Sequence, residues 1–469
     1  MPRVIALALA LATLVGCAWQ SYVAAPPDET RVPNEIAAAR LDAPDQLELL
    51  ARAGVPHAAA SAWTPGQLAL VAVARSPQLL AARSAIAAAI ARSRLARQRR
   101  NPQLNLGIER HSEREDWSDS RWSVGPSIDL TLVPPVVRRL TGERADLDVA
   151  LARLEALEIA WQARAAANDA ALAVLASQEA SEPAAAATRL RDEAVAAARA
   201  LVAAGVSDAF EWQTMMLERN DARLAQLSRT TAGAAAQAAL AATLSAPLSA
   251  VSDLALVADA PMPVPDYDAL RARMLKSHPG VLQALAAHAQ AERDLALAVA
   301  AQYPSLQLSP GYFFDQGDHV WSLLGGVVVP LFARNEVAIE SAAAARDAAC
   351  AAVYAAQAEA IAELQRRHAA WRAATTVLAE ARAIVADIVA AHAELLRKRE
   401  AGIGDDLAVA RAGLQVAEAR LQLATAAAEE RRTRAALLAS ARVADLDPPF
   451  ARVLDELTAT APAAEAAAR

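Results

Sequence analysis

The stretch from Tyr303 to Ile339 decides the fold, and it reads YPSLQLSPGYFFDQGDHVWSLLGGVVVPLFARNEVAI. From Leu306 to Tyr312 apolar residues alternate with polar or small ones, and the alternation resumes at Trp321. The turn-forming residues Asp315-Gln316-Gly317-Asp318 lie between the two alternating runs. Alternation with a period of two on both sides of a turn predicts a β-hairpin with one apolar face.

The hairpin pattern occurs twice in the chain. Asn101-Pro102-Gln103-Leu104 precedes Tyr303-Pro304-Ser305-Leu306 by 202 positions (303 − 101 = 202), and residues 122–132 alternate as a second strand. Ser76-Pro77 precedes His278-Pro279 by the same 202 positions (278 − 76 = 202). Two landmarks at one offset indicate an internal duplication. We expect each copy to hold a pair of helices, a hairpin and then a long helix.

The composition points to long, closely packed helices. Of 469 residues 55% are hydrophobic but only 4% are aromatic, and alanine supplies much of the difference. Alanine has the highest helix propensity. The formal net charge is −7 and no basic stripe stands out, so the sequence gives no support for nucleic-acid binding.

The first residues predict export and a lipid anchor. Residues 4–16 form a short apolar run after Arg3, which is too short for a membrane span and typical of a signal peptide. Leu14-Val15-Gly16-Cys17 resembles the bacterial lipobox, which predicts acylation of Cys17 after cleavage. The alternative is an ordinary signal peptide with an incidental cysteine. The other thiol, Cys350, is interpreted as a small packing residue inside a helix.

Two very long helices are predicted after the hairpins. They run from about residue 136 to 204 and from about 335 to 401, and at 1.5 Å per residue each would be about 100 Å long. Pro183 lies within the first, so we expect a kink there. Charged residues recur along both helices, so neither is interpreted as a membrane span.

Both long helices end in matching turns, which we call the helical tips. The tips read Ala204-Gly205-Val206-Ser207-Asp208 and Ala401-Gly402-Ile403-Gly404-Asp405. Glycine can take the left-handed conformation that closes a helix, and Ser207 or Asp405 could cap the next one. In the returning helices Leu217 and Leu224 are one heptad apart, the spacing of helices that wind around each other. With Leu240 they match, at an offset of 197 (414 − 217 = 197), Leu414, Leu421 and Leu437.

The four predicted strands are about as long as strands that cross a bilayer. Four strands cannot close into a barrel, since the smallest transmembrane barrels need about eight. Open sheet edges are not tolerated in hydrocarbon. The sequence therefore predicts a mostly α protein with a small transmembrane β part, in which several chains combine into one barrel with a long helical extension.

The duplicated order of hairpin, long helix, glycine tip and returning helix resembles the TolC-type outer-membrane efflux channels over about residues 64–445. The resemblance implies a homotrimer whose three chains pool twelve strands and whose helices form a tunnel across the periplasm. Pro330-Leu331-Phe332-Ala333-Arg334-Asn335 with Ile339, and the segment from Pro310 to Trp321, are similar to the outer-membrane lipoprotein subunits of heavy-metal (CzcC-like) RND efflux systems. The first copy departs from this pattern at Leu132-Val133-Pro134-Pro135.

The resemblance implies a passive exit duct in the outer membrane, with no enzymatic activity and no cofactor, that exports metal cations. The implied partners are a periplasmic adaptor, an inner-membrane transporter and outer-membrane lipid. A drug-efflux or type I secretion duct is an alternative, and a lipid-anchored coiled-coil rod without a pore is another. The predicted divisions are a signal peptide (1–16), a tether (17–63), two repeats (64–260 and 261–445) and a tail (446–469).

The candidate site residues lie in the hairpin loops, on the strands and at the helical tips. No catalytic constellation and no phosphate-binding loop is found. His111 with the acidic residues up to Asp119, and Asp315 with Asp318 and His319, could bind a metal, but solvated loop charges explain them equally, so no metal site is predicted. The strand residues predicted to face the membrane are Trp122, Val124, Ile128, Leu130, Trp321, Leu323, Val327 and Val329, and aromatic residues near them, Trp117, Tyr312, Phe313 and Phe314 included, are expected to form an interfacial girdle.

The predicted residues for adaptor docking and gating are Gly205, Asp208, Gly402, Gly404, Asp405 and Asp406. Their carboxylates could attract cations around a threefold entrance, or could simply cap helices. Some relatives carry carboxylates six and nine residues after the second tip glycine. Those positions are Ala408 and Arg411 here, so that acidic constriction is not carried over.

Overall fold

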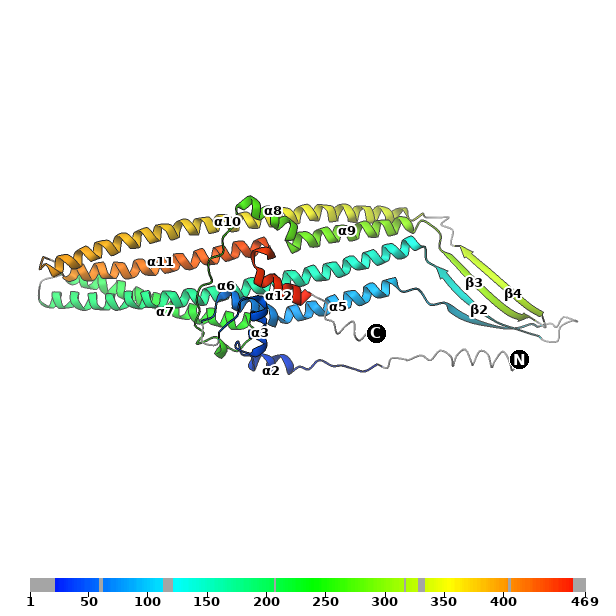
Figure 1. The fold of residues 1–469 in the computed structure, drawn as a ribbon, viewed down its shortest axis with the longest axis horizontal. Coiled ribbons are helices and arrows are strands. Elements are labelled where there is room, and N and C mark those ends of the chain that lie inside the picture. Colours follow the sequence, from blue (N-terminus) through cyan, green and yellow to red (C-terminus); the bar gives the residue numbers. More distant parts are fainter. Residues whose placement is uncertain are drawn as a thin grey trace.

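The chain folds into a long bundle of helices with a small β-sheet at one end (Figure 1). This computed structural model describes residues 22–58, 62–112, 121–205, 208–315, 318–327, 334–403 and 406–458. Cys17, Gly404, Asp405, Val329, the pattern at 330–333 and the loop residues 113–120 lie outside these ranges.

The internal duplication is confirmed by two helix pairs. In the first copy, α4 (Pro65–Arg75) is followed by α5 (Pro77–Arg97), and in the second, α8 (Tyr267–Ser277) is followed by α9 (Pro279–Ala300). The second helix of each pair begins in the same way, because the Ser76 hydroxyl accepts a hydrogen bond from the Leu79 N–H and His278 Nδ1 accepts one from the Gly280 N–H. Side chains at this position satisfy backbone donors that a helix start leaves unpaired.

Both predicted hairpins form, and they join into one antiparallel sheet in the order β1-β2-β3-β4. The strands are β1 (Gln103–Arg110), β2 (Trp122–Leu132), β3 (Leu306–Asp315) and β4 (Asp318–Val327). β2 pairs with β3, for example Leu132 with Leu306, so the two repeats are tied together through the sheet. β1 and β4 are left as the two edges.

The long helices α6 (Pro135–Ala203, 69 residues) and α10 (Glu336–Glu400, 65 residues) lead away from the sheet. At 1.5 Å per residue each is about 100 Å long. α6 continues as one helix through Pro183, where the sequence predicts a kink. None of the helices in the described ranges carries an apolar stretch long enough to cross a membrane.

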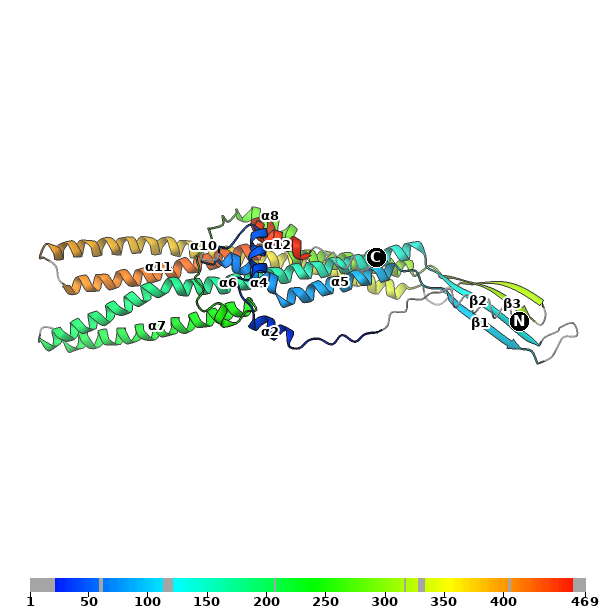
Figure 2. The same cartoon turned by 60° about the horizontal axis from the view of Figure 1, so that its bottom comes forward.

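Two shorter helices return from the tips, α7 (Ala209–Thr243) and α11 (Asp406–Ala441). In the half of the molecule near the tips the helices lie in the order α7-α6-α11-α10, and in the half near the sheet in the order α5-α6-α9-α10. Figure 2 shows α6 with α7 and α10 with α11 as two hairpins side by side. Each half is therefore a layer four helices wide with two open edges.

A compact region surrounds the middle of the helices. It contains α2 (Arg31–Ala37), α3 (Pro44–Ala53), the 3-10 turns η1 (Leu248–Ala250) and η2 (Ala444–Leu446), and α12 (Pro448–Thr458). Phe450 of α12 is fully buried with Leu50, and its ring meets that of Trp161 edge-on at 4.7 Å. Part of the segment that the sequence suggests is a tail is thus a helix packed into the core.

Candidate functional site

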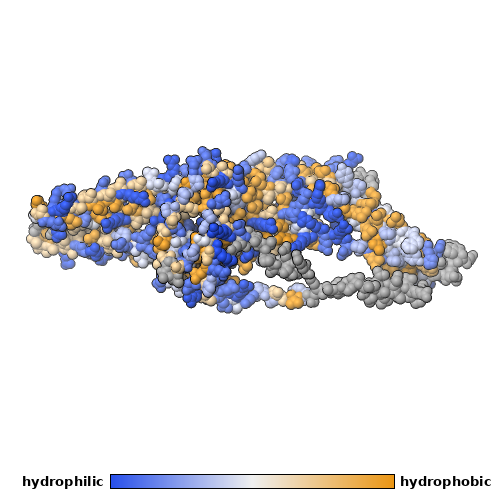
Figure 3. Space-filling view, viewed as in Figure 1, coloured by the Kyte–Doolittle hydropathy of each residue, from blue (hydrophilic) through white to orange (hydrophobic). Residues whose placement is uncertain are grey.

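The register of the sheet gathers apolar side chains on one surface, which we call the apolar face. Because Leu104 is opposite Ile128, Leu130 opposite Leu308, and Tyr312 opposite Trp321, these side chains project to the same side. Large apolar residues of this face that are exposed in the single chain are Leu104, Leu106, Ile108, Trp122, Ile128, Leu130, Leu132, Leu306, Trp321, Leu323 and Val327. Val124 is on the same face but half-buried. The described residues that the sequence assigns to the membrane therefore share one surface. In Figure 3 orange, hydrophobic atoms lie at the sheet end of the molecule beside pale and blue ones.

The opposite surface of the sheet, which we call the polar face, is lined mainly by hydrogen-bonding side chains. Asn105 Nδ2 donates to Asp129 at 2.8 Å across the β1–β2 pair, and Gln103 Nε2 donates to Asn105 Oδ1 at 2.9 Å. Ser127, Thr131, Gln307, Ser309 and Ser322 lie on the same face. A sheet with one apolar and one polar face suits a wall between hydrocarbon and water.

Phe313 lies on the polar face, although the sequence suggests that it belongs to the interfacial aromatic girdle. Its ring lies over three glycines, Gly107, Gly125 and Gly311. A Cβ atom at Gly125 would lie 2.6 Å from the ring and 2.1 Å from the Tyr312 carbonyl oxygen, so a side chain there does not fit. Glycine in a strand often marks such a close approach. The glycines at positions 107, 125 and 311 were therefore the sequence signal from which the face of Phe313 could have been predicted.

Aromatic side chains of the apolar face gather at the end of the sheet farthest from the helices. The ring centroids of Tyr312 and Trp321 are 4.8 Å apart, and the Tyr312 hydroxyl lies 2.5 Å from His319 Nδ1. On β2 the Arg110 guanidinium lies 5.8 Å from the centre of the Trp122 ring. Amphipathic aromatic side chains in such a position are typical of a membrane interface.

The tip turns have the predicted backbone. Gly205 and Gly402 have φ angles of +71° and +75°, which favour glycine, and a Cβ at either would meet no atom within 4 Å. The Asp208 carboxylate accepts a hydrogen bond from the Phe210 N–H at 3.2 Å, so Asp208 caps α7. Ser207, the cap that the sequence suggests, lies outside the described residues. Asp406 is the first residue of α11.

An ion pair joins the two helical hairpins next to the tips. The Arg411 guanidinium of α11 contacts the Glu211 carboxylate of α7, and both side chains are about half exposed. Arg411 occupies the second position at which relatives carry an acid. In this chain that position holds two tips together within one protomer.

The outer edges of the helical layer carry exposed apolar residues. Leu217 and Leu224 of α7 are 66% and 67% exposed, whereas their counterparts Leu414 and Leu421 in α11 are half-buried between α6 and α10. Equivalent residues are thus covered in one repeat and bare in the other. Other large apolar residues exposed on α5, α7 and α10 include Leu80, Leu95, Phe210, Leu227, Val377 and Ile384.

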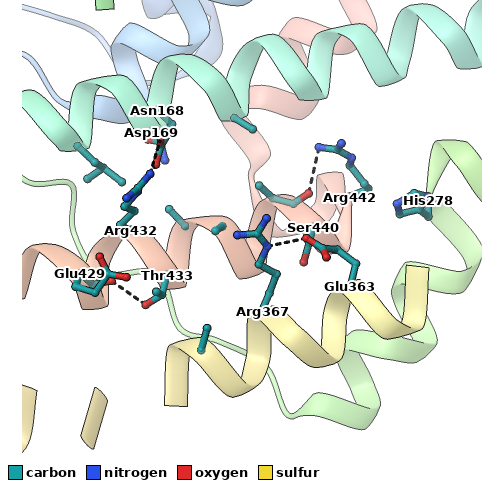
Figure 4. A pocket seen from close by; sticks show the side chains of 16 residues that line it. Asn168, Asp169, His278, Glu363, Arg367, Glu429, Arg432, Thr433, Ser440 and Arg442 are labelled. Atoms are coloured by element: carbon teal, nitrogen blue, oxygen red, sulfur yellow. Dashed lines mark hydrogen bonds and ion pairs between the residues drawn. The ribbon is translucent and has the colours of Figure 1, made fainter. Parts of the chain in front are cut away.

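A groove of about 620 Å³ lies between α6, α10 and α11 near the middle of the molecule (Figure 4). The Arg432 guanidinium donates to Asp169 at 2.6 Å and 3.2 Å, and Arg367 donates to Glu363 at 2.7 Å. At one end of the groove burial lowers the pKa of His278, and the positive charge of Arg442 lowers it further. Charged side chains thus line the groove, and two of its arginines, Arg432 and Arg367, pair with carboxylates of the same lining.

Beside this groove, Arg164 lies under α12. Its guanidinium contacts the Asp447 carboxylate and lies 5.1 Å from the centre of the Phe450 ring. Burial lowers the pKa of Arg164 to about 10, against the attraction of Asp259. Arg164 is therefore charged at neutral pH, and the ion pair and the aromatic ring hold α12 in place.

Of the loop residues considered as metal ligands, His111 and Asp315 come together. His111 Nε2 lies 3.4 Å from Asp315 Oδ1 and 3.4 Å from the Ser123 hydroxyl oxygen. His319 points to the apolar face, toward Tyr312. Among the described residues, no group of three or more His, Cys, Asp or Glu side chains is placed to hold a metal ion.

The sequence matches no profile of a known protein family and no curated protein. Solved structures of outer-membrane channels are similar to it. The channel OprN has a TM-score of 0.66 and 16% identity, with 92% of this chain and 99% of that chain covered. VceC from Vibrio cholerae has a TM-score of 0.63 and 19% identity, covering 81% and 96%. The MtrE channel from Neisseria gonorrhoeae has a TM-score of 0.61 and 17% identity, covering 81% and 88%.

These likenesses extend over most of this chain and nearly all of each channel. The resemblance to the TolC-type channels that the sequence suggests is thereby confirmed at the level of the fold. Fold alone does not establish function, which must be argued from the surfaces described above.

Proposed function

Since the chain has the fold of outer-membrane efflux channels, we propose that it is the exit duct of a tripartite efflux pump, anchored in the outer membrane and extending into the periplasm. The observation that carries this proposal is the four-stranded sheet. Its apolar face is exposed, and among the described residues its edge strands β1 and β4 each pair with a strand on one side only. Such a sheet is stable in a bilayer only if other copies close it.

Three copies would pool twelve strands, with β1 of one protomer beside β4 of the next. The apolar face would then contact lipid and the polar face would line a water-filled lumen. Strands of 8 to 11 residues suit a tilted crossing of the hydrocarbon layer.

The helical edges support the same assembly. In a ring, α7 of one protomer would lie against α10 of its neighbour, which would cover Leu217 and Leu224 on one side and Val377 and Ile384 on the other. Each pair of residues is seven positions apart, as in helices that pack as coiled coils. The duct would thus continue from the barrel as a tunnel of helices.

The duct is proposed to be passive, with an inner-membrane transporter as the source of energy. A periplasmic adaptor would dock at the tips near Gly205 and Gly402, the exposed turns farthest from the sheet (Figure 1). Acylation of Cys17 would add a lipid anchor to the barrel. The proposed cargo is metal cations, and drugs or secreted proteins are the alternatives.

The mass of the purified complex in detergent tests the assembly. We expect three chains of about 49 kDa each, and a monomer or dimer would contradict the proposal.

A Cys17→Ser variant separates the anchor from the assembly. It should lose metabolic labelling with fatty acid and still form a trimer, and continued labelling would contradict acylation at this cysteine.

A further inference from the structure

The end of the sheet farthest from the helices brings together three side chains that the sequence keeps far apart. His111 follows β1, Ser123 lies near the start of β2, and Asp315 ends β3. The His111 N–H donates to the Arg121 carbonyl at 2.8 Å, which continues the β1–β2 ladder beyond Arg110. His111 is thus held on the sheet, and the alternation of the strand places it on the polar face.

The separation of the imidazole and the carboxylate in this cluster matches that of two ligands of one metal ion. His111 Nε2 lies 3.4 Å from Asp315 Oδ1 and 3.4 Å from the Ser123 oxygen, and the Ser123 hydroxyl donates a hydrogen bond to Asp315 Oδ1. Ligands about 2.0–2.2 Å from a tetrahedral zinc ion are about 3.3–3.6 Å apart. One ion could therefore be held by the imidazole and the carboxylate, with the hydroxyl or water beside them.

The charges around the cluster favour a cation. The register places Glu109 opposite Ser123 and Asp318 opposite Asp315, all on the polar face. Arg110, next to them in sequence, lies over Trp122 on the apolar face. Among the described residues at this end of the polar face, the exposed Arg121 is outnumbered by the carboxylates of Glu109, Asp315 and Asp318. Imidazole with carboxylate suits borderline divalent ions such as Zn²⁺ and Cu²⁺, whereas Mg²⁺ and Ca²⁺ take oxygen ligands alone.

We propose that His111 and Asp315 form a low-affinity site for a divalent transition-metal ion at the outer mouth of the channel, one per protomer. The inference rests on the proposed function, because it takes the polar face to be the lumen and makes the ion a cargo. A metal ion with only two protein ligands is bound weakly, which suits a site on an exit path because such a site must release its ion. The site lies where exported cations would leave the barrel.

Zn²⁺ binding to the purified full-length trimer tests the proposal without any transport assay. We expect one Zn²⁺ per chain by calorimetry, with the dissociation constant raised at least about tenfold by His111→Ala and by Asp315→Asn. His319→Ala is the matched control, because His319 lies on the other face, and it should bind Zn²⁺ as the unmodified chain does. Excess Mg²⁺ should not compete.

The electron paramagnetic resonance spectrum of bound Cu²⁺ gives a second readout. We expect nitrogen hyperfine coupling that disappears in His111→Ala and stays in His319→Ala. Absence of Zn²⁺ binding, or equal binding in His111→Ala, would overturn the site. The mass of each variant in detergent is measured in parallel, so a failure of the site is distinguishable from a failure of the trimer.

Discussion

The ion pair between Arg411 and Glu211 allows a quantitative test of how the tips are held closed. If the duct opens by separation of its helical hairpins, this contact between α11 and α7 must break. The side chains are 48% and 47% exposed, so the pair is well solvated. Exposed ion pairs stabilise by about 0.2–1 kcal/mol each.

Three copies acting together change the balance between closed and open tips more than one does. The sum over three protomers is about 0.6–3 kcal/mol. At about 1.4 kcal/mol per factor of ten, Arg411→Ala should raise the ratio of open to closed channels by about 3-fold to about 140-fold. The effect should shrink from 0.1 M to 1 M salt, because the Debye length falls from about 10 Å to about 3 Å.

Single-channel recording of the purified protein in planar bilayers measures this ratio as the fraction of time spent open. The control is Arg189→Ala, which removes an exposed ion pair with Glu193 inside α6 and leaves the contact between hairpins intact. Exchange of the charges, Arg411→Glu with Glu211→Arg, should restore the closed state. An open fraction in Arg411→Ala equal to that of the control at 0.1 M salt would refute the reasoning.

Three further predictions concern the core, the groove and the sheet. Phe450→Ala, which removes a fully buried ring, should cost about 3–5 kcal/mol and release α12, seen as a lower Tm and faster proteolysis at the C-terminus. Because the pKa of His278 is lowered, the unfolded chain binds more protons than the native one as pH falls through about 6.5, so stability should fall there, and His278→Asn should remove this loss in chemical denaturation. Leu323→Lys should cost about 2–4 kcal/mol per chain and reduce barrel assembly, whereas Leu324→Lys on the polar face should be tolerated, and equal effects would mean that the faces are assigned wrongly.

The hairpins, the helix pairs and the long helices could be predicted because their signals are local. Period-two alternation marks the strands, and proline or glycine marks the ends of helices such as α5 and α6. The predicted long helices agree with α6 and α10 to within one residue at each end. The register also places on one face the described strand residues that the sequence assigns to the membrane.

Contacts between distant segments were not predictable from local pattern. The pairing of β2 with β3, the ion pair between Arg411 and Glu211, and the approach of His111 to Asp315 each join residues about 170–200 positions apart. Helix α12 was missed because it is short and begins with Pro448-Pro449, which looks like the end of ordered structure. Phe313 was assigned to the wrong face because the run Tyr312-Phe313-Phe314 suggests an aromatic girdle, although successive strand residues point to opposite sides.

The central claim is that copies of this chain close their sheets into a water-filled pore. Conductance across a planar bilayer after addition of the purified full-length protein tests it most directly. We predict stepwise increases in current of one unit size, from complexes whose mass is that of three chains, and no steps from Leu323→Lys. A trimer that is stably folded but gives no conductance, even with Arg411→Ala at low salt, would contradict the claim and favour a lipid-anchored rod.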